Sequence, residues 1–226
     1  LRFLGITAHL KSSEVLAFAM PLGMGLLGWM VFFFLFYGAS GKIELTVLMC
    51  IFSFFSLSLR PLVANGFEQT RILIGHIIAD RWRLLLLFIL VLALVFDISE
   101  AFSPPVDGDS MAYHFALPKF FLKEGTLIPM FQAVEGSIPL LIHMTYLAAL
   151  GTGGEQTLTL WVMATGYFTA YLFFVILKRF MVTNWAIAFM IIFLTTPAVV
   201  YGAGSGQVEV RNAGFALMAI FAATEI

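Results

Sequence analysis

The feature that most constrains this chain is the segment 15–37, "VLAFAMPLGMGLLGWMVFFFLFY", which contains no charged side chain. A helix of about 20 consecutive apolar residues crosses the hydrocarbon core of a bilayer, and this run is long enough to do so. The rest of the chain has the same character, since 61% of its residues are hydrophobic and only 11% are charged. Soluble domains carry about 25% charged residues. The sequence therefore predicts a membrane protein.

Further apolar runs indicate additional membrane spans. After the first, the expected spans are residues 45–59, 84–102, 157–177 and 185–200, and a sixth begins near residue 213. In lipid, only helices and closed barrels satisfy every backbone polar group, and runs of this length predict helices. We expect an all-α, polytopic transmembrane helix bundle of about six spans, the last one truncated, with amphipathic surface helices in a large outer loop.

These spans divide the chain into three regions. They are the N-terminal membrane helices (1–102), an extracytoplasmic loop (103–154) and the C-terminal membrane helices (155–226). Within the loop, the apolar segment 138–150 is too short to span and predicts a surface helix that "GTGG" closes. The chain begins with Leu1 rather than Met, and its last apolar stretch is only about half to two-thirds of a span. We therefore expect either a processed chain or the N-terminal portion of a longer protein.

The basic residues predict which loops face the cytoplasm, because Lys and Arg accumulate on that side. They cluster before the first expected span, between the second and third, and between the fourth and fifth: Arg2 and Lys11; Arg60, Arg71, Arg81 and Arg83; Lys178 and Arg179. If the spans alternate in direction, all three clusters lie on one side, and the N-terminus is cytoplasmic. Residues 38–44, 103–154 and 201–212 then share the opposite, non-cytoplasmic side.

Composition also excludes several classes of function. The net charge of -1 argues against a nucleic-acid partner, because such partners are bound through an excess of basic residues. Cys50 is the single cysteine, so it forms no internal disulfide and provides no metal-binding pattern; we expect it to be a small core residue. Metalloprotease, phosphate-loop, dinucleotide-binding and nucleophile-elbow patterns are absent.

The outer loop contains a segment rich in chemical groups, "VDGDSMAYHFALPKFFLKEG" at residues 106–125. Asp109 is positioned to cap a helix over 110–117, Pro118 to kink or restart it, and Gly125 to end it. An apolar stripe at helical spacing consists of Met111, Phe115, Pro118 and Leu122. The pattern predicts an amphipathic helix at the bilayer surface.

Asp109 is the first candidate catalytic residue. A positioned carboxylate can act as general base toward a hydroxyl nucleophile, and this role is compatible with capping a helix. Gly108 allows the backbone to bend so that the carboxylate of Asp107 can face the same site. The paired carboxylate oxygens could also hold a divalent cation. The alternative for Asp107 is a solvated loop acid.

The residues that follow are candidates for substrate binding. Tyr113 and His114 lie one turn into the expected helix, where a histidine is either a structural hydrogen-bond partner or a functional group. Lys119 and Lys123 are four residues apart, so both could meet a phosphate headgroup. The alternative is that both lysines extend toward the interface from a helix beside lipid.

A second group of charges lies in "GSGQVEVRNAG". Glu209 and Arg211 are expected at the outer mouth of the fifth and sixth spans, where ionisable residues tend to be functional. The alternative is an ion pair that orients the loop. Asp97 is expected to reach the headgroup region. The remaining histidines have no ligand spacing and are expected to be core or interfacial residues: His9, His76 and His143.

Taken together, these motifs resemble polytopic glycosyltransferases of the GT-C fold, including bacterial relatives of protein O-mannosyltransferases and aminoarabinose transferases. The first outer loop of those enzymes carries Asp-x-x-x-Tyr and an amphipathic helix that ends in Gly, which here are Asp109, Tyr113 and Gly125. The likeness is strongest to a bacterial subgroup with D-x-x-x-Y-H-x-x-L-P-[KR], which Asp109, Tyr113, His114, Leu117, Pro118 and Lys119 match. It continues through "SIPLLIHMTYLAALG" and "FLTTPAVVYGAGSGQVEV" and covers about residues 100–226. The subgroup has Val-Asp where this chain has Val208-Glu209.

The resemblance implies an inverting transfer of a sugar from a polyprenyl-phosphate carrier to a hydroxyl acceptor on the non-cytoplasmic face of a bacterial inner membrane. It makes Asp109 the base or metal-linked carboxylate and Glu209 the second acid. Lys119, His114 or Arg211 would neutralise the leaving phosphate. The expected partners are membrane lipids, the polyprenyl-phosphate sugar donor and other membrane subunits. The alternative is a non-catalytic transmembrane subunit of a larger membrane complex, with a truncated glycosyltransferase-like fold.

Overall fold

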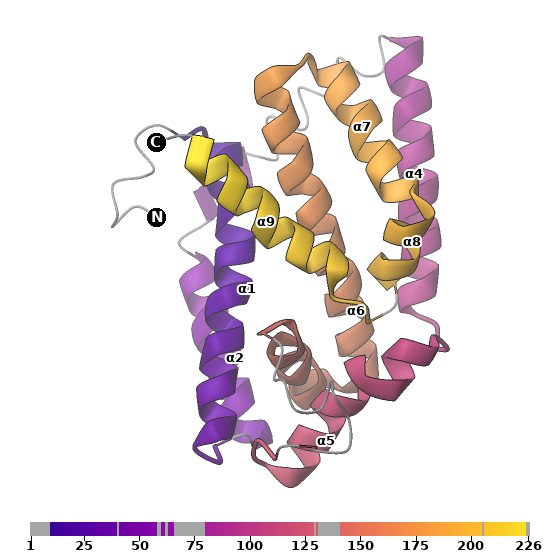
Figure 1. Ribbon diagram of the computed structural model, residues 1–226. Helices are drawn as coiled ribbons and strands as arrows, with labels where there is room; N and C mark the ends of the chain where they lie inside the picture. The colour runs from indigo at the N-terminus through magenta and orange to yellow at the C-terminus, as the bar shows by residue number, and fades with distance from the viewer. Residues whose placement is uncertain are drawn as a thin grey trace.

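The structure is a computed structural model, and it describes residues 10–39, 41–57, 60–61, 63–65, 80–128, 130, 141–204 and 206–224. The described residues lie mostly in helices, and no strand occurs among them. The helices are α1 (Ser12–Phe36), α2 (Lys42–Ser56), α4 (Arg81–Ala101), the π-helical turn η3 (Ser110–His114), α5 (Ala116–Glu124), α6 (Leu141–Phe180), α7 (Thr183–Thr195), α8 (Pro197–Gly204) and α9 (Glu209–Thr224). The all-α prediction is confirmed for these residues (Figure 1).

Within the described residues, three helices are long and apolar enough to cross a membrane. They are α1, α4 and α6, and they support the prediction of an integral membrane protein. The other apolar helices are shorter: α2 has 15 residues, α7 has 13 and α9 has 16. At 1.5 Å per residue, about 20 residues are needed to cross a hydrocarbon core of about 30 Å. The count of six spans therefore stays a prediction.

The expected span 185–200 is interrupted. Helix α7 ends at Thr195, because the next residue, Thr196, is extended (φ -65°, ψ 128°) and precedes Pro197. The ring of a proline disfavours helical geometry in the residue before it. Pro197 then begins α8, at a first-turn position that needs no backbone N–H. The chain thus turns aside before it reaches the segment that carries Glu209.

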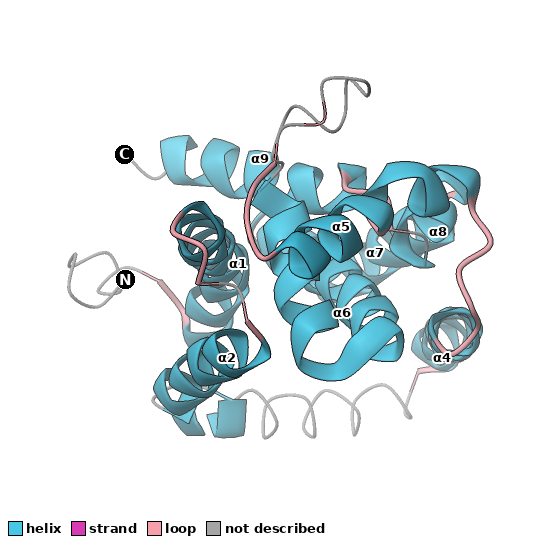
Figure 2. Ribbon diagram, turned by 90° about the horizontal axis from the view of Figure 1, so that it is seen from below, coloured by secondary structure: helices cyan, strands magenta, loops and turns pink. Residues whose placement is uncertain are grey.

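Helix α6 is the centre of the molecule, and it contacts α1, α2, α4, α5, α7, α8 and α9. Figure 2 shows it between the α1–α2 pair and α4. The approach of α1 to α6 is close, since a methyl group on Gly28 would lie 2.7 Å from both the Leu141 carbonyl oxygen and its Cδ1. Glycine therefore allows these two helices to pack with their backbones near each other.

Helix α6 bends at Gly154, whose backbone (φ 78°, ψ -167°) is not helical. This conformation lies at positive φ, where a side chain would be strained, so glycine fits the bend. The segment before the bend was expected to be a surface helix that "GTGG" closes; it is helical, but α6 continues past that sequence, and its position at the membrane surface stays a prediction. From Ile142 to Gly151 every residue of it is buried. Helices α1, α2 and α5 all contact α6, and their side chains share an apolar core with Met144, Leu147 and Ala148.

Helix α4 is the least covered of the long helices. Large apolar side chains along it are exposed, among them Trp82 (73%), Phe88 (59%) and Phe96 (70%). Contact with lipid tails removes the cost that such a surface would have in water. Cys50 on α2 is likewise exposed, so the prediction of a core residue is wrong. Only Leu45 and Leu48 of α2 are fully buried, and Met49 and Phe52 are partly buried against the same core.

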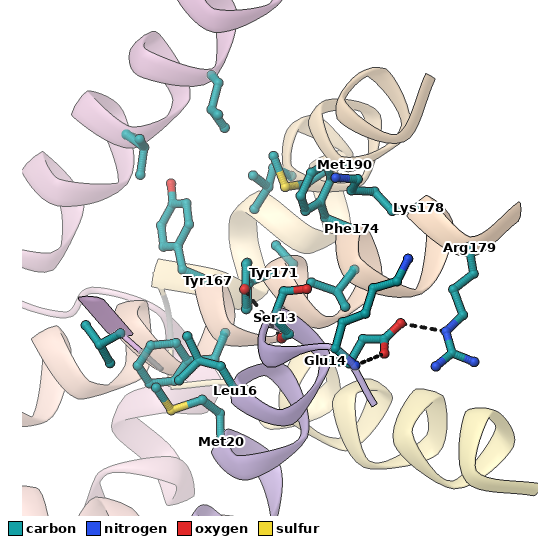
Figure 3. A pocket seen from close by; sticks show the side chains of 18 residues that line it. Ser13, Glu14, Leu16, Met20, Tyr167, Tyr171, Phe174, Lys178, Arg179 and Met190 are labelled. Atoms are coloured by element: carbon teal, nitrogen blue, oxygen red, sulfur yellow. Dashed lines mark hydrogen bonds and ion pairs between the residues drawn. The ribbon is translucent and has the colours of Figure 1, made fainter. Parts of the chain in front are cut away.

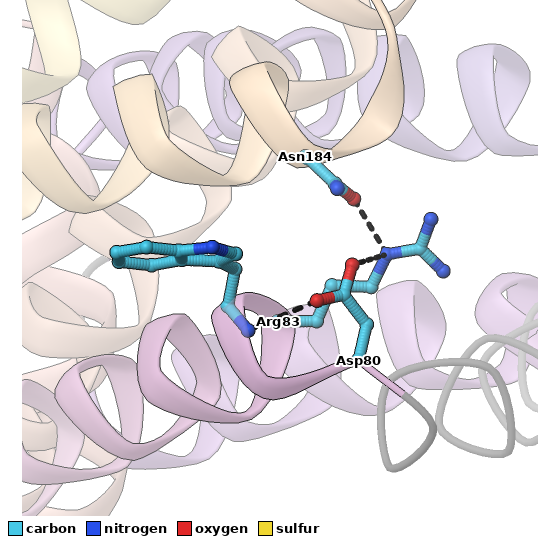
Figure 4. Close-up of polar contacts among 4 residues, drawn as sticks. Asp80, Arg83 and Asn184 are labelled. Carbon is cyan, nitrogen blue, oxygen red and sulfur yellow. Dashed lines mark hydrogen bonds and ion pairs between the residues drawn. The ribbon is translucent and has the colours of Figure 1, made fainter.

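The start of α4 is tied to the start of α7. Asp80 caps α4 by accepting a hydrogen bond from the Trp82 backbone N–H at 3.0 Å. Arg83 donates from Nε to Asn184 Oδ1 at 2.6 Å and lies 3.5 Å from Asp80 Oδ2 (Figure 4). Thus a polar contact between residues 101 positions apart holds the otherwise loosely packed α4 beside α7.

Candidate functional site

The loop after α4 begins with a helix cap, but Asp107 provides it rather than Asp109. The Asp107 carboxylate accepts hydrogen bonds from the Ser110 backbone N–H at 2.8 Å and from the Ser110 hydroxyl at 2.7 Å. Asp109 makes no side-chain cap. The prediction that Asp109 caps the helix is therefore wrong. The capping residue lies two positions earlier, because the first helical turn begins at Gly108 instead of Ser110. This leaves the Asp109 carboxylate exposed and available for other contacts.

The turn that follows is π-helical rather than α-helical. The Phe115 backbone N–H donates to the Ser110 carbonyl at 2.9 Å, which is a bond across five residues. Such turns are rare and are frequent at functional sites. The wider turn shifts the helical register, so Met111 is 53% exposed while Phe115, the next position of the predicted apolar stripe, is 2% exposed. The chain restarts as α5 with Pro118 in its first turn, and Gly125 ends α5 in the left-handed conformation (φ 71°), as predicted.

Two distant segments meet at this turn. The Gly206 backbone N–H donates to the Ser110 hydroxyl at 2.7 Å, and Gln207 Nε2 donates to Asp109 Oδ2 at 3.3 Å. These bonds join residues 96 and 98 positions apart. Glycine is needed at position 206, since a methyl group there would lie 2.5 Å from the Phe115 ring. The sequence predicted that these two segments share one side of the membrane, and the structure brings them into contact.

Arg211 anchors the second segment from within. It is only 1% exposed, and it donates from Nη1 to the carbonyl of Gln207 at 2.7 Å and from Nε to the Thr165 hydroxyl at 3.1 Å. It also donates to the carbonyls of Val162 and Gly202. Four groups from α6, α8 and the 206–208 turn thus surround one guanidinium. A buried charge is tolerated only with such hydrogen-bonding partners.

Behind the carboxylates lies a pair of buried histidines. His114 and His143 are each 1% exposed, and the His114 Nδ1 to His143 Nε2 distance is 2.8 Å. One ring therefore donates to the other, while His114 Nε2 and His143 Nδ1 have no hydrogen-bond partner within the described residues. The expectation of a core or interfacial histidine holds for His143, which is buried, but its pairing with His114, 29 residues away in the sequence, was not predicted.

The pKa of His114 reflects the charges of the site. Burial lowers the pKa of His114, and the negative charges of Glu209, Asp109 and Asp107 oppose this shift. All three carboxylates therefore lie near enough to His114 to act on its imidazole. Asp109 and Glu209 are exposed there, while Asp107 is half-buried by its capping role. The arrangement is an open acidic surface over a neutral, buried imidazole.

The other predicted binding residues lie around this surface. The Tyr113 ring packs 4.0 Å from the His114 ring, centroid to centroid, and is partly buried. Lys119 Nζ lies 2.7 Å from the Glu155 carboxylate, just past the bend of α6, and both side chains are partly exposed. Lys123 is exposed on α5, one turn further along the chain.

Asp97 does not reach the headgroup region as predicted. It is 3% exposed on α4 and accepts a hydrogen bond from the Tyr167 hydroxyl on α6. The hydrogen bond compensates for the burial of the carboxylate, which an apolar helix alone would not allow. His9 and His76 lie outside the described residues.

The described parts of the chain contain no group of three or more His, Cys, Asp or Glu side chains that could hold a metal ion. The carboxylates nearest to such a role are Asp107 and Asp109. One Asp107 oxygen is occupied by Ser110, and Asp109 is held by Gln207. The residues present are therefore a poor fit for a resident divalent cation, and no chemical step is assigned to one.

Sequence reasoning did not single out several residues that build the site. Ser110 and Gln207 join the two segments, and Tyr146 supports them by donating to the Gln207 carbonyl at 3.4 Å. Gln207 lies inside the motif "GSGQVEV", two residues before Glu209, so the sequence could have indicated that it belongs to the site. The role of Tyr146 had no local signal, because it depends on a contact across 61 residues.

Comparison of the chain with family models, with curated proteins and with solved structures finds no match.

Proposed function

We propose that this chain is a membrane glycosyltransferase-like protein that transfers a sugar, with inversion, from a polyprenyl-phosphate carrier to a hydroxyl acceptor on the non-cytoplasmic face. One observation carries the proposal. The segment of Asp109 and the segment of Glu209 are far apart in the sequence, yet the hydrogen bonds of Gly206 and Gln207 join them. Two exposed carboxylates thereby lie around one site at the end of a membrane helix bundle.

In this proposal Asp109 is the general base. The acceptor hydroxyl gives its proton to the Asp109 carboxylate while its oxygen forms a bond to the anomeric carbon. The bond from that carbon to the phosphate oxygen breaks on the opposite face, and the polyprenyl phosphate leaves with the electron pair. A base must be exposed to the substrate and held in place, and the Gln207 amide at 3.3 Å satisfies the second need.

The leaving phosphate requires a cation, and Lys119 suits this role best. Its side chain is 37% exposed and pairs with Glu155, whose side chain is 62% exposed, so a phosphate can replace the Glu155 carboxylate. Arg211 and His114 are each 1% exposed. We assign both to positioning: Arg211 holds the 206–208 turn through its carbonyl contacts, and His114 packs beneath the carboxylates.

Glu209 is the second acid of the proposal. It is exposed at the first position of α9, where a helix N-terminus stabilises a negative charge. From there it can accept hydrogen bonds from sugar hydroxyls that the acceptor or donor presents. Removal of Glu209 should therefore weaken substrate binding more than it slows the chemical step.

The experiment is transfer of labelled sugar from polyprenyl-phosphate donors by the protein in proteoliposomes, compared with Asp109→Asn. The Asn side chain keeps an oxygen that can accept from Gln207 but cannot take a proton. We expect a loss of about 100-fold or more in rate. Glu124→Gln, a change of the same charge at the far end of α5, is the matched control and should keep full activity.

Equal rates for the native protein and Asp109→Asn would remove Asp109 from the mechanism. A folded protein that transfers no sugar from any of several donors would favour the alternative, a non-catalytic membrane subunit. Lys119→Gln should raise the KM for the phosphate-linked donor. A change confined to kcat would contradict its assigned role.

A further inference from the structure

A cavity of about 570 Å³ lies at the end of the bundle away from the carboxylates. Residues of α1, α4, α6 and α7 line it, where α4 stands apart from the other helices (Figure 3). Ligand pockets in proteins typically measure about 300–1,000 Å³, so this space can hold an organic molecule rather than a few waters. None of the residues of the proposed transferase site lines it.

The deep part of the cavity is apolar. Its walls include Leu90 and Leu94 from α4, Met190 and Leu194 from α7, and Phe168 from α6. The polar groups among these walls are few, and they are already engaged. The Tyr167 hydroxyl donates to Asp97, and the Tyr171 hydroxyl donates to the Ser13 carbonyl at 3.5 Å. A ligand in this region would therefore meet hydrocarbon, which excludes a sugar or a nucleotide.

The mouth of the cavity is basic. Lys11, Lys178 and Arg179 line it together with the single acid Glu14. Arg179 Nε lies 2.6 Å from the Glu14 carboxylate, which also accepts the Lys11 backbone N–H at 2.7 Å. Glu14 is only 2% exposed, so its charge is compensated within the protein.

The two lysines at the mouth are exposed, and neither has a carboxylate within ion-pair distance among the residues that the structure describes. The Lys178 ammonium lies over the Phe174 ring at 5.8 Å from its centroid, which places the charge at the rim of the cavity. Two positive charges therefore lie at the entrance to a hydrocarbon-lined space in a membrane protein.

We propose that this cavity binds an anionic phospholipid, with one acyl chain between α4 and the α1–α6–α7 wall and the phosphate between Lys11 and Lys178. The charge at the mouth favours an anionic over a zwitterionic headgroup, as basic residues at a membrane surface generally do. The acyl chain replaces the missing contacts of α4 and stabilises its position. The proposal does not depend on the transferase activity, because it concerns different residues at the opposite end of the bundle.

The test is native mass spectrometry of the full chain in a neutral detergent, titrated with phosphatidylglycerol or with phosphatidylcholine of the same acyl chains. We expect one phosphatidylglycerol to be retained more tightly than phosphatidylcholine. The double variant Lys11→Gln, Lys178→Gln should bind phosphatidylglycerol about tenfold more weakly. The control Lys42→Gln removes a lysine charge on α2, away from the cavity, and should bind phosphatidylglycerol as the native chain does.

A second pair of variants tests the acyl-chain site without a change of charge. Leu94→Trp fills the cavity from α4 and should abolish retention of the lipid. Leu92 is 41% exposed on the same helix, and Leu92→Trp should leave lipid retention unchanged. Equal binding of the two lipids, or equal retention by Leu94→Trp and Leu92→Trp, would overturn the proposal. The melting temperature of each lipid-free variant establishes that it is folded.

Discussion

At one end of the molecule, Asp109 and Glu209 are exposed carboxylates beside a buried guanidinium, Arg211. At the other end, Lys11 and Lys178 are exposed ammonium groups beside a buried carboxylate, that of Glu14. The signs of the buried and the exposed charges are exchanged between the two ends. At each end a buried ion of one sign is held by internal hydrogen bonds, and ions of the other sign face outward.

The difference between the ends lies in what holds the buried ion. Arg211 is surrounded by three carbonyls and a hydroxyl from several elements, so it holds the backbone of those elements together. Glu14 is held by the Arg179 side chain and one backbone N–H, so it joins the ends of only two helices. The carboxylate end is therefore assembled by tertiary contacts, whereas the basic end keeps an open cavity.

The comparison requires that the two ends face opposite sides of the membrane. Cysteines introduced one at a time by Asp109→Cys, Glu209→Cys and Lys178→Cys, in a chain with Cys50→Ser, test this with a membrane-impermeant maleimide. We expect the first two to react from the same side and the third only from the opposite side. Labelling of Asp109→Cys and Glu209→Cys from opposite sides would end the shared-site proposal.

The largest effect on stability should come from Arg211. Arg211→Met leaves the carbonyls of Val162, Gly202 and Gln207 buried without their donor, so we expect a loss of about 3–5 kcal/mol. In a chain of this size that lowers the melting temperature in detergent by on the order of 10 °C. Arg83→Met, at a partly exposed contact, should cost about 1 kcal/mol or less. Equal shifts for the two variants would contradict the organising role of Arg211.

A smaller effect is expected from Gly206→Ala. The added methyl group would lie 2.5 Å from the Phe115 ring, and overpacking of this kind costs about 1–3 kcal/mol. Because the same backbone bonds Ser110, sugar transfer should fall together with the melting temperature. Gly23→Ala on α1 is the matched control, since no atom lies within 4 Å of its added methyl group, and it should change neither quantity.

The smallest effect is a pH dependence that originates at His114. Burial lowers its pKa below the ordinary value of 6.5, so the folded protein resists taking up this proton. Above pH 6.5 the imidazole is neutral in the folded and unfolded states and contributes nothing. As the pH falls below 6.5, the unfolded state binds the proton first and the folded state loses stability.

The melting temperature should accordingly fall by a few degrees between pH 7.5 and pH 5, and His114→Gln should reduce this slope. The groups that act on His114 are His143 in direct contact, the carboxylates of Asp107, Asp109 and Glu209, and the Arg211 guanidinium. A steeper slope in His114→Gln than in the native chain would show that the carboxylates, rather than burial, dominate.

Several features of the fold could be predicted because their causes are local. Residues 15–37 and 84–102 were predicted as apolar helices, and α1 and α4 occupy them with small shifts of their ends. Gly125 was predicted to end a helix, because only the positive φ of a left-handed residue closes the last turn cheaply. Each of these predictions depends on neighbours within a few residues in the sequence.

The candidate site could be predicted only in outline. The motifs around Asp109 and Glu209 were recognised, but the capping role was assigned to Asp109 when Asp107 performs it. The two aspartates lie two residues apart and have the same propensity to cap a helix, so the choice depends on where the first helical turn begins, which is Gly108. Ser110, whose backbone N–H the Asp107 carboxylate caps, also accepts a hydrogen bond from the Gly206 backbone N–H, a contact that no local pattern contains.

The sequence by itself determined that lipid surrounds this protein. A chain with so few charged side chains and such long apolar runs is stable as helices in a membrane. The tertiary structure alone decided which polar groups are buried. Arg211 and Asp97 have no local signal for burial, and each is tolerated because residues far away in the chain, Thr165 and Val162 for Arg211 and Tyr167 for Asp97, share its hydrogen bonds.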